Sequence, residues 1–349
     1  MAKHIVGLDI GRNMLRAVEV ENADKAKPII VRFAEIALPE GSVQSGEVRE
    51  IHTVAAAIKR LWATGGFKSR DVVLGMGNQR VLARDLTVPR AGIQQIRESL
   101  PFQVQDMLPV PVSEALLDFY PISEEQTEAG AVVNGLLIAA IKDSVLGNVN
   151  AVRRAGLNPV QVDLIPFALT RVLVRGAMQR GTIAVIDIGA STTNVVITTN
   201  GVPQFVRMIP AGGEDLTKAL VNRLEVGPAQ AEMAKRTRGL NSAPVSSELE
   251  QFTAEVVHTV SGDLLNSLRN TLNYFANTRQ NDPIQAIMLT GGGAQLSGFA
   301  QALGDVMRVQ IIQADPFAGL DMSRAVKSSA PGEHVAMTVA LGLALGSAA

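Results

Sequence analysis

The chain has 349 residues, of which 47% are hydrophobic and 19% are charged, and its formal net charge is −1 at pH 7. This near-neutral balance, with one tryptophan and two tyrosines, lacks the basic field and the stacking aromatics that proteins use to bind nucleic acid. The absence of cysteine excludes a disulfide framework, and four scattered histidines indicate no transition-metal site. We therefore expect two or three domains with a large buried core and no nucleic-acid partner.

The N-terminal quarter has the pattern of three strands followed by a helix. Residues 5–10 and 15–20 predict a hairpin, and the apolar stretch 29–38 predicts a third strand. Apolar residues then recur at helical spacing from Val54 to Leu61, before two glycines that end the helix. This order of elements is typical of a ribonuclease-H-like lobe.

The next segment predicts a separate α/β unit inserted into the first lobe. We expect strands over 72–76, 81–88, 115–122 and 132–141, helices over 93–107 and 144–155, and a mobile acidic loop over 124–130. A helix from Asp163 to Arg175 then leads back to the first lobe.

A second lobe begins with strands over 183–188, 194–199 and 205–209, of which the last two are joined by the hairpin signal Asn200-Gly201. The segments that follow are predicted as helices over 216–224, 229–235 and 248–275, a polar linker over 237–247, a strand over 286–290 and a helix from Leu296. The last apolar run, 335–345, is shorter than the roughly 18 residues of a membrane-spanning helix. Since the N-terminus also lacks the pattern of a signal peptide, we expect a soluble cytoplasmic protein.

Two similar strand-to-turn motifs carry the functional hypothesis. GLDIG at residues 7–11 and IDIGASTT at residues 186–193 each bring an aspartate and a glycine to the end of an apolar strand. A phosphate chain is held by backbone amides of tight turns, and a nearby carboxylate holds hydrated magnesium. We therefore predict ATP or ADP between the lobes, with Asp9 and Asp187 binding Mg²⁺ through water, and Gly291–Gly293 close to the adenine or ribose.

Further motifs resemble the actin-like ATPase superfamily and, within it, the PilM family of type IV pilus assembly, over nearly the whole chain. They are PFQVQ at 101–105, LPVP at 108–111, DFY at 118–120, AGLNPVQVD at 155–163, PFA at 166–168, IPAGGEDLT at 209–217, AEMAKR at 231–236 and LTGGGA at 289–294.

The resemblance implies an actin-like two-lobed fold of the α/β class with a 1C-like inserted subdomain. Its parts are lobe 1 (residues 1–71 and 156–180), the inserted subdomain (72–155), lobe 2 (181–334, with a 2B part at about 216–282) and a C-terminal helix on a lobe (335–349). The residues assigned to nucleotide binding are Asp9, Gly11, Arg12, Asn13, Asp187, Gly189, Ala190, Ser191, Thr192, Gly212, Gly213, Glu232, Lys235, Arg236, Gly291, Gly292, Gly293 and Ala294.

Some of these residues also have an ordinary interpretation. Glu232 and Lys235 reach the nucleoside by the resemblance, but taken alone they form a solvated helix face. Arg12, where the family usually has a hydroxyl, pairs with phosphate or lies in solvent. Ile165 stands where relatives often carry Glu, so Asp163 is the candidate catalytic residue, with a helix cap as the alternative.

The implied function is a cytoplasmic scaffold of pilus or related secretion assembly, with the nucleotide as a structural or switching ligand and slow hydrolysis at most. Its implied partner is the N-terminal cytoplasmic tail of a PilN-like inner-membrane protein, held as an extended peptide between lobe 1 and the inserted subdomain. Membrane contact would come only through that partner, and other pilus components and self-association are further candidates. The alternatives are an active ATPase or kinase and an FtsA-like cell-division filament protein.

Overall fold

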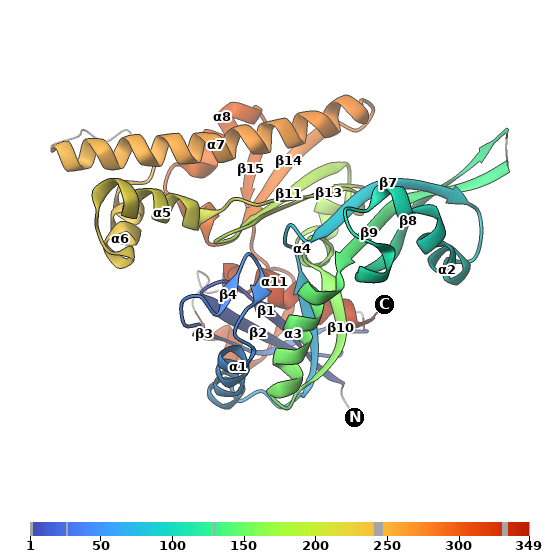
Figure 1. Ribbon diagram of the computed structural model, residues 1–349, viewed down its shortest axis with the longest axis horizontal. Coiled ribbons are helices and arrows are strands. Elements are labelled where there is room, and N and C mark those ends of the chain that lie inside the picture. Colours follow the sequence, from blue (N-terminus) through green and yellow to red (C-terminus); the bar gives the residue numbers. More distant parts are fainter. Residues whose placement is uncertain (1–2, 26, 129, 241–246, 330–333, 349) are drawn as a thin grey trace.

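The computed structural model describes residues 3–25, 27–128, 130–240, 247–329 and 334–348. Two lobes lie one above the other in Figure 1, each built on a β-sheet, and a smaller sheet projects from their side. Within the described residues, no helix is both long and apolar enough to cross a membrane.

The sheet of the first lobe has six strands in the order β10-β6-β1-β2-β3-β16. Strands β1, β2 and β3 form an antiparallel meander, and β6 and β10 extend the sheet parallel to β1. The bounds are β1 (His4–Ile10), β2 (Met14–Glu21), β3 (Ile29–Ala37), β6 (Asp71–Met76), β10 (Asn158–Leu164) and β16 (Asp321–Met322).

The sheet of the second lobe repeats this topology. Its order is β13-β12-β11-β14-β15, with an antiparallel meander of three strands and two parallel strands beside its first strand. The bounds are β11 (Thr182–Ile188), β12 (Thr193–Thr199), β13 (Val202–Ile209), β14 (Ile284–Thr290) and β15 (Gln310–Gln313). The structure thus confirms two ribonuclease-H-like lobes.

Strand β11 explains why the inner part of these central strands is largely apolar. Ile183 and Val185 belong to a core that the two lobes share, whereas Ala184, Ile186 and Ile188 belong to a second core on the other face. Because successive side chains of a strand point to opposite faces, a strand buried on both faces needs apolar residues at every position.

Helices cover the outer faces of both sheets (Figure 1). In the first lobe, α1 packs on β2, β3 and α3 through the face that its spacing predicts, and it ends at Gly66, whose φ is +64°. In the second lobe, α7 and α8 supply apolar side chains to the core on the outer face of the sheet. The bounds are α1 (Ile51–Gly65), α3 (Lys142–Arg154), α5 (Gly213–Leu224), α6 (Pro228–Arg238), α7 (Glu248–Thr278) and α8 (Phe299–Met307).

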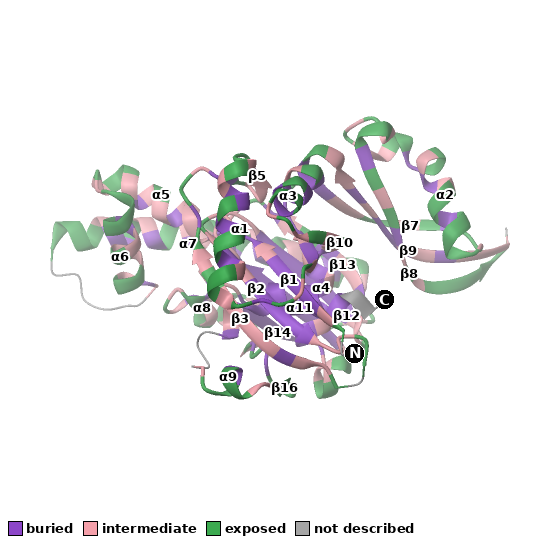
Figure 2. Ribbon diagram, turned by 90° about the horizontal axis from the view of Figure 1, so that it is seen from below, coloured by how far each residue is buried: buried purple, intermediate pink, exposed green. Residues whose placement is uncertain are grey.

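Two helices between the sheets interlock the lobes. Helix α4 (Ile165–Leu173) follows β10 of the first sheet and packs on β11 and β12 of the second as well as on β10 and β6. Helix α11 (Thr338–Ala344) comes after β15 of the second sheet and β16 of the first, and it packs on α4 and on β1, β2 and β6 of the first sheet. A Cβ at Gly7 of β1 would lie 1.9 Å from the Ala340 carbonyl oxygen, and one at Gly342 would lie 2.2 Å from that of Ala168. Glycine therefore allows this close packing, and Figure 2 shows α4 and α11 in the buried centre of the molecule.

The projecting unit consists of a three-stranded sheet, β7-β9-β8, and helix α2. Its own small core includes Val88, Leu100, Phe119 and Leu137. The bounds are β7 (Val81–Pro89), α2 (Ile93–Gln103), β8 (Ala115–Thr127) and β9 (Gly130–Ile141).

Three local expectations differ from the structure. Strand β6 and helix α3, assigned above to the inserted unit, pair or pack with the first lobe, because β6 lies between β1 and β10. The acidic stretch predicted as a loop continues β8 to Thr127, where pairing with β9 satisfies its backbone. Residues 158–164 form strand β10, so the helix predicted from Asp163 begins only at Ile165.

Short elements complete the described chain. They are β4 (Val43–Gln44), β5 (Glu47–Val48), α9 (Arg324–Lys327) and the 3-10 turns η1 (Gln105–Met107), η2 (Val112–Glu114), η3 (Gly176–Gln179), η4 (Gly293–Gln295) and η5 (Leu345–Ala348). Residues 241–246 of the predicted polar linker lie outside the described residues.

Candidate functional site at the junction of the lobes

The two predicted phosphate turns have the same backbone geometry. The Gly11 amide donates a hydrogen bond to the Met14 carbonyl at 3.0 Å, and the Gly189 amide donates to the Thr192 carbonyl at 3.0 Å. A Cβ at either glycine would lie 2.9 Å from that same carbonyl oxygen. The equivalent glycines, at positions 11 and 189, are therefore required by close contact inside each turn.

The hairpin register places a polar residue opposite each aspartate. Asp9 of β1 pairs with Arg16 of β2, and Asp187 of β11 pairs with Asn194 of β12. The sequence analysis named neither Arg16 nor Asn194. In each hairpin four residues separate the last paired residues, Ile10 and Leu15 or Ile188 and Thr193, so the residue seven positions after each aspartate lies directly across from it. This spacing is the signal that could have identified Arg16 and Asn194.

The two carboxylates lie close enough to affect each other. Burial and, to a smaller extent, the Asp9 carboxylate raise the pKa of Asp187 to about 7, although Asn194 and Arg16 oppose the change. Burial also raises the pKa of Asp9, and the Arg16 guanidinium partly offsets that effect. Desolvation and mutual repulsion thus disfavour two negative charges at this place without a cation.

Asn194 adds an oxygen atom without a hydrogen-bond partner to this pair. Its side chain is 4% exposed, and its Oδ1 atom accepts no hydrogen bond within the described residues. A Cβ at Gly77 would lie 2.8 Å from that oxygen, so glycine leaves space beside it. A buried oxygen without a partner beside two carboxylates fits hydrated Mg²⁺, which keeps several waters and takes few direct protein ligands. Among the described residues, no group of three or more His, Cys, Asp or Glu side chains could hold a metal by itself.

The glycine-rich start of α5 packs against the second turn. The Gly213 amide donates to the Gly189 carbonyl at 3.0 Å, and the Glu214 amide donates to the Ala190 carbonyl at 2.8 Å. A Cβ at Gly212 would lie 2.5 Å from the Ala190 oxygen. In the described part of the chain, the Ala190 and Ser191 amides donate to no backbone oxygen, which leaves them for a phosphate.

The third glycine loop approaches the same turn. Gly291 has a φ of +92°, and a Cβ there would lie 2.4 Å from the Ile188 carbonyl oxygen and 2.6 Å from Asp187 Oδ1. A Cβ at Gly293 would lie 3.2 Å from the Gly189 oxygen. Gly291 is therefore required both by its backbone conformation and by contact with the Asp187 carboxylate.

Helix α6 contributes a connected group of polar side chains. Lys235 Nζ donates to the Gly213 carbonyl at 3.0 Å and to Thr217 Oγ1 at 2.8 Å. Glu232 accepts from Thr217 and Arg236, each at 2.8 Å, and forms an ion pair with Lys235. Although burial raises the pKa of Glu232, the hydrogen bonds from Lys235, Arg236 and Thr217 lower it to about 2. Lys235, only 13% exposed, is thus tied to the glycine loop, whereas Arg236 is 77% exposed.

The remaining predicted residues lie as follows. Arg12 is not in solvent: it forms an ion pair with Glu214 at the start of α5. Asn13 is exposed, and its carbonyl accepts from the Leu38 amide at 2.8 Å. A Cβ at Gly292 would meet no atom within 4 Å, and Ala294 is buried.

Asp163 lies on β10 and not at a helix terminus. Its carboxylate is bound by the guanidinium of Arg171 on α4 and accepts from the Leu164 amide at 2.7 Å. Its catalytic role stays a prediction.

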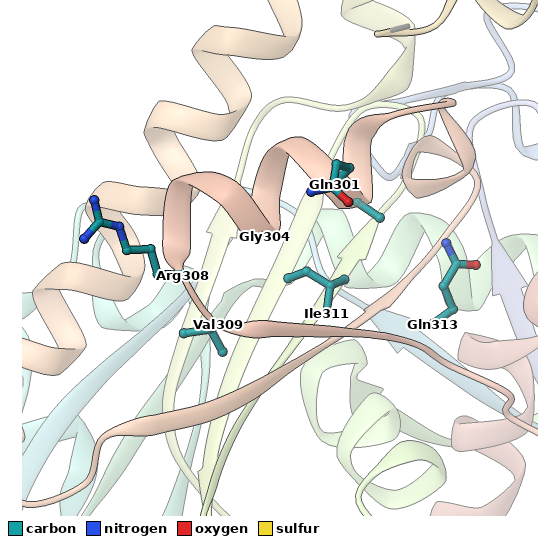
Figure 3. Close-up of a pocket in the computed structure, with 7 residues that line it drawn as sticks. Gln301, Gly304, Arg308, Val309, Ile311 and Gln313 are labelled. Carbon is teal, nitrogen blue, oxygen red and sulfur yellow. The ribbon is translucent and has the colours of Figure 1, made fainter.

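One hollow lies away from the junction, and another borders the glycine-rich start of α5. Figure 3 shows the first, between α8 and the edge strand β15, lined by Gly304, Arg308 and Ile311 among others and by no residue predicted for the site. The second, of about 230 Å³, lies between α7 and the start of α5 and includes Gly212, Gly213 and Gly293 in its lining.

Comparison with known proteins identifies the family. The family described as type IV pilus assembly protein PilM matches residues 7–348. The chain belongs to the PilM family. The structure of a PilM-PilN type IV pilus biogenesis complex aligns with 99% of this PilM-family chain and 98% of its own, at 29% identity and a TM-score of 0.86. MreB5 of Spiroplasma citri bound to AMPPNP aligns with 97% of the chain and 94% of its own, at 12% identity and a TM-score of 0.55, and shares the actin-like fold.

Cell-division proteins are also similar to this PilM-family chain. FtsA of Bacillus subtilis is 25% identical over 279 residues, which cover 73% of the chain and 62% of FtsA. FtsA of Escherichia coli K12 is 25% identical over 198 residues, which cover 50% of the chain and 47% of FtsA. The matches thus span about half to three-fifths of the length of these relatives.

Proposed function

We propose that the chain is an actin-like, nucleotide-binding scaffold of type IV pilus or related secretion assembly, acting at the cytoplasmic face of the inner membrane. Its partner is the N-terminal cytoplasmic tail of a PilN-like membrane protein. Family membership and the similarity to the PilM-PilN complex support the assembly role and the partner. The nucleotide is a structural or switching ligand.

One observation carries the nucleotide proposal: two equivalent turns, from two lobes, bring Asp9 and Asp187 into electrostatic contact. Mg²⁺ held through water by these carboxylates and by Asn194 would neutralise the repulsion between them and the phosphates. The Ala190 and Ser191 amides would donate to the phosphate chain, and Glu232 and Lys235 on α6 would lie beside the nucleoside.

The side chains near the proposed metal position support a protein that hydrolyses ATP slowly at most. A Cβ at Gly77 would lie 2.9 Å from the Cβ of Ile165 as well as 2.8 Å from Asn194 Oδ1, so an apolar side chain lies close to that oxygen. An isoleucine can neither orient nor deprotonate a water molecule. The site is therefore better suited to holding ATP than to hydrolysing it.

The nucleotide proposal is tested by equilibrium binding of a fluorescent ATP analogue with and without Mg²⁺. Asp187→Ala is expected to weaken binding at least about tenfold, since it removes a metal-binding carboxylate. Asp305→Ala, which removes an exposed carboxylate on α8, is the matched control and should bind as the wild type does. Equal binding by Asp187→Ala and the wild type would contradict the assignment.

The unpaired edge of β10 is the place we propose for the membrane-protein tail. Strand β10 ends the first sheet, and Val160 and Val162, on one face of it, are 46% and 37% exposed. An extended peptide can add a strand to such an edge, with apolar pockets for alternate side chains. The nearby ring contact of Tyr120 on β8 with Phe167 on α4, at 4.7 Å between centroids, joins the projecting unit to the interlobe helices.

Titration with synthetic N-terminal tails of membrane proteins encoded beside this gene tests the partner proposal. Val160→Asp with Val162→Asp should abolish tail binding and leave nucleotide binding unchanged. Val306→Asp is the control, because Val306 is 41% exposed but lies on α8 of the second lobe. Tail binding that survives the paired substitution would exclude this edge.

A further inference from the structure

An ion pair joins the first phosphate turn to the second lobe. The Arg12 guanidinium, in the turn between β1 and β2, contacts the carboxylate of Glu214, and the two side chains are only 14% and 15% exposed. A pair so shielded from water interacts more strongly than a surface pair, and loss of one partner leaves a poorly solvated charge.

Glu214 is held by both turns. Its amide donates to the Ala190 carbonyl of the second turn at 2.8 Å, and its side chain binds Arg12 of the first turn. A second cation near this carboxylate is Lys218, at 3.7 Å on the same helix and 57% exposed. The first turn of α5 therefore connects the turns through one residue.

We propose that Arg12 exchanges Glu214 for the terminal phosphate of a nucleoside triphosphate and so makes the site prefer triphosphate over diphosphate. This inference rests on the proposed nucleotide function. While Glu214 neutralises Arg12, a phosphate at the first turn gains little from the guanidinium and is repelled by the carboxylate. Binding of a terminal phosphate therefore requires Arg12 to release Glu214, and that release loosens the link between the first lobe and α5.

Arg12 is the ligand-contacting residue in this scheme, and Glu214 is a positioning residue that acts through it. Guanidinium groups bind phosphate and carboxylate through the same paired N–H donors, so the two anions compete. A diphosphate lacks the group that would take Arg12, and it leaves the ion pair intact.

The test compares dissociation constants for ATP and ADP, both with Mg²⁺, by isothermal titration calorimetry. Glu214→Gln should raise the preference for ATP over ADP by about tenfold, and Arg12→Gln should lower it by a similar factor. The double variant should behave as Arg12→Gln does, since Glu214 acts only through Arg12. Lys218→Gln is the control and should keep the wild-type ratio.

If the single variants lose stability, a variant with the two charges exchanged still tests the proposal. Arg12→Glu with Glu214→Arg restores the ion pair and the wild-type thermal stability but places a carboxylate in the first turn, so ATP binding should fall while ADP binding is retained. Unchanged ATP-to-ADP ratios in proteins that bind both nucleotides would overturn the exchange and leave the proposed nucleotide function standing. Failure of the wild type to bind either nucleotide would overturn both.

Discussion

At the scale of single residues, the raised pKa of Asp187 links stability to pH. A carboxyl group whose pKa rises from 3.8 to about 7 on folding holds its proton more tightly in the folded state, so ionisation of this group destabilises the fold. The cost is absent below about pH 4, grows as the pH rises toward 7, and is constant above it.

Asp187→Asn should therefore stabilise the nucleotide-free protein at pH 8, by up to about 4 kcal/mol, and much less at pH 5. Urea unfolding at the two pH values measures the difference. Asp9→Asn should act in the same direction, since burial also raises the pKa of Asp9 and the Asp9 carboxylate raises that of Asp187. If the free energy of unfolding of the wild type and of Asp187→Asn changed with pH in parallel, the Asp187 carboxyl would have the same pKa in the folded and unfolded states, which would contradict the prediction.

A substitution of Asp163 can distinguish a structural role of this residue from a catalytic one. Removing its charge leaves Arg171 without its carboxylate partner between α4 and α11, so Asp163→Asn should lower the free energy of unfolding by about 1–3 kcal/mol. Phosphate release per nucleotide-bound molecule should not change. Loss of turnover at wild-type stability would instead support the catalytic prediction.

At the scale of elements, helix α11 depends on backbone contact. Gly342→Ala would drive a Cβ to 2.2 Å from the Ala168 carbonyl oxygen, so we expect a loss of about 3 kcal/mol as α11 and α4 move apart. Gly262→Ala is the matched control. It lies inside α7 with no atom within 4 Å of the new Cβ, and it should gain about 0.5–1 kcal/mol from helix propensity. Thermal unfolding of the two variants in opposite directions checks both.

The elements also show where prediction from sequence ends. The hairpins around Asp9 and Asp187 are predictable because turn chemistry and apolar alternation act within about twenty residues. Strand β10 was missed because its alternation, with Val160 and Val162 exposed, is short and its pairing partner β6 lies far away in sequence. The packing of α4 and α11 between the two sheets has no local signal, since the sequence of an apolar helix does not indicate which sheet it covers.

At the scale of the whole molecule, the two helices between the sheets make the lobes depend on each other. Helix α4 contacts strands of both sheets, and it packs on α11, which covers the inner face of the first sheet. We therefore expect a single unfolding transition. Trp62 fluorescence reports on α1 of the first lobe, and hydrogen exchange of β11 and β14 reports on the second. Denaturant curves from these two probes should coincide, and a separate early transition of either lobe would contradict the interlocked core.

In the candidate site too, features set by local sequence were predictable, and features set by contacts between distant segments were not. Both turns and the glycine loops were predictable in kind from motifs, and the family resemblance named Glu232 and Lys235, but not the contact of Lys235 with Gly213. Arg16, Asn194 and Glu214 were not singled out, because their relevance depends on register across a hairpin and on contact between lobes.

The unequal partners of the two aspartates also imply an order of binding. Arg16 faces Asp9 but also forms an ion pair with Glu35 at 3.0 Å, and the uncharged Asn194 faces Asp187. These five side chains therefore carry two net negative charges when their carboxylates are ionised, and one divalent cation would neutralise them. Polyphosphate arriving before the metal would meet repulsion, whereas polyphosphate arriving with it or after it would not. The junction would thus respond to the metal complex of a nucleotide and exclude the free anion.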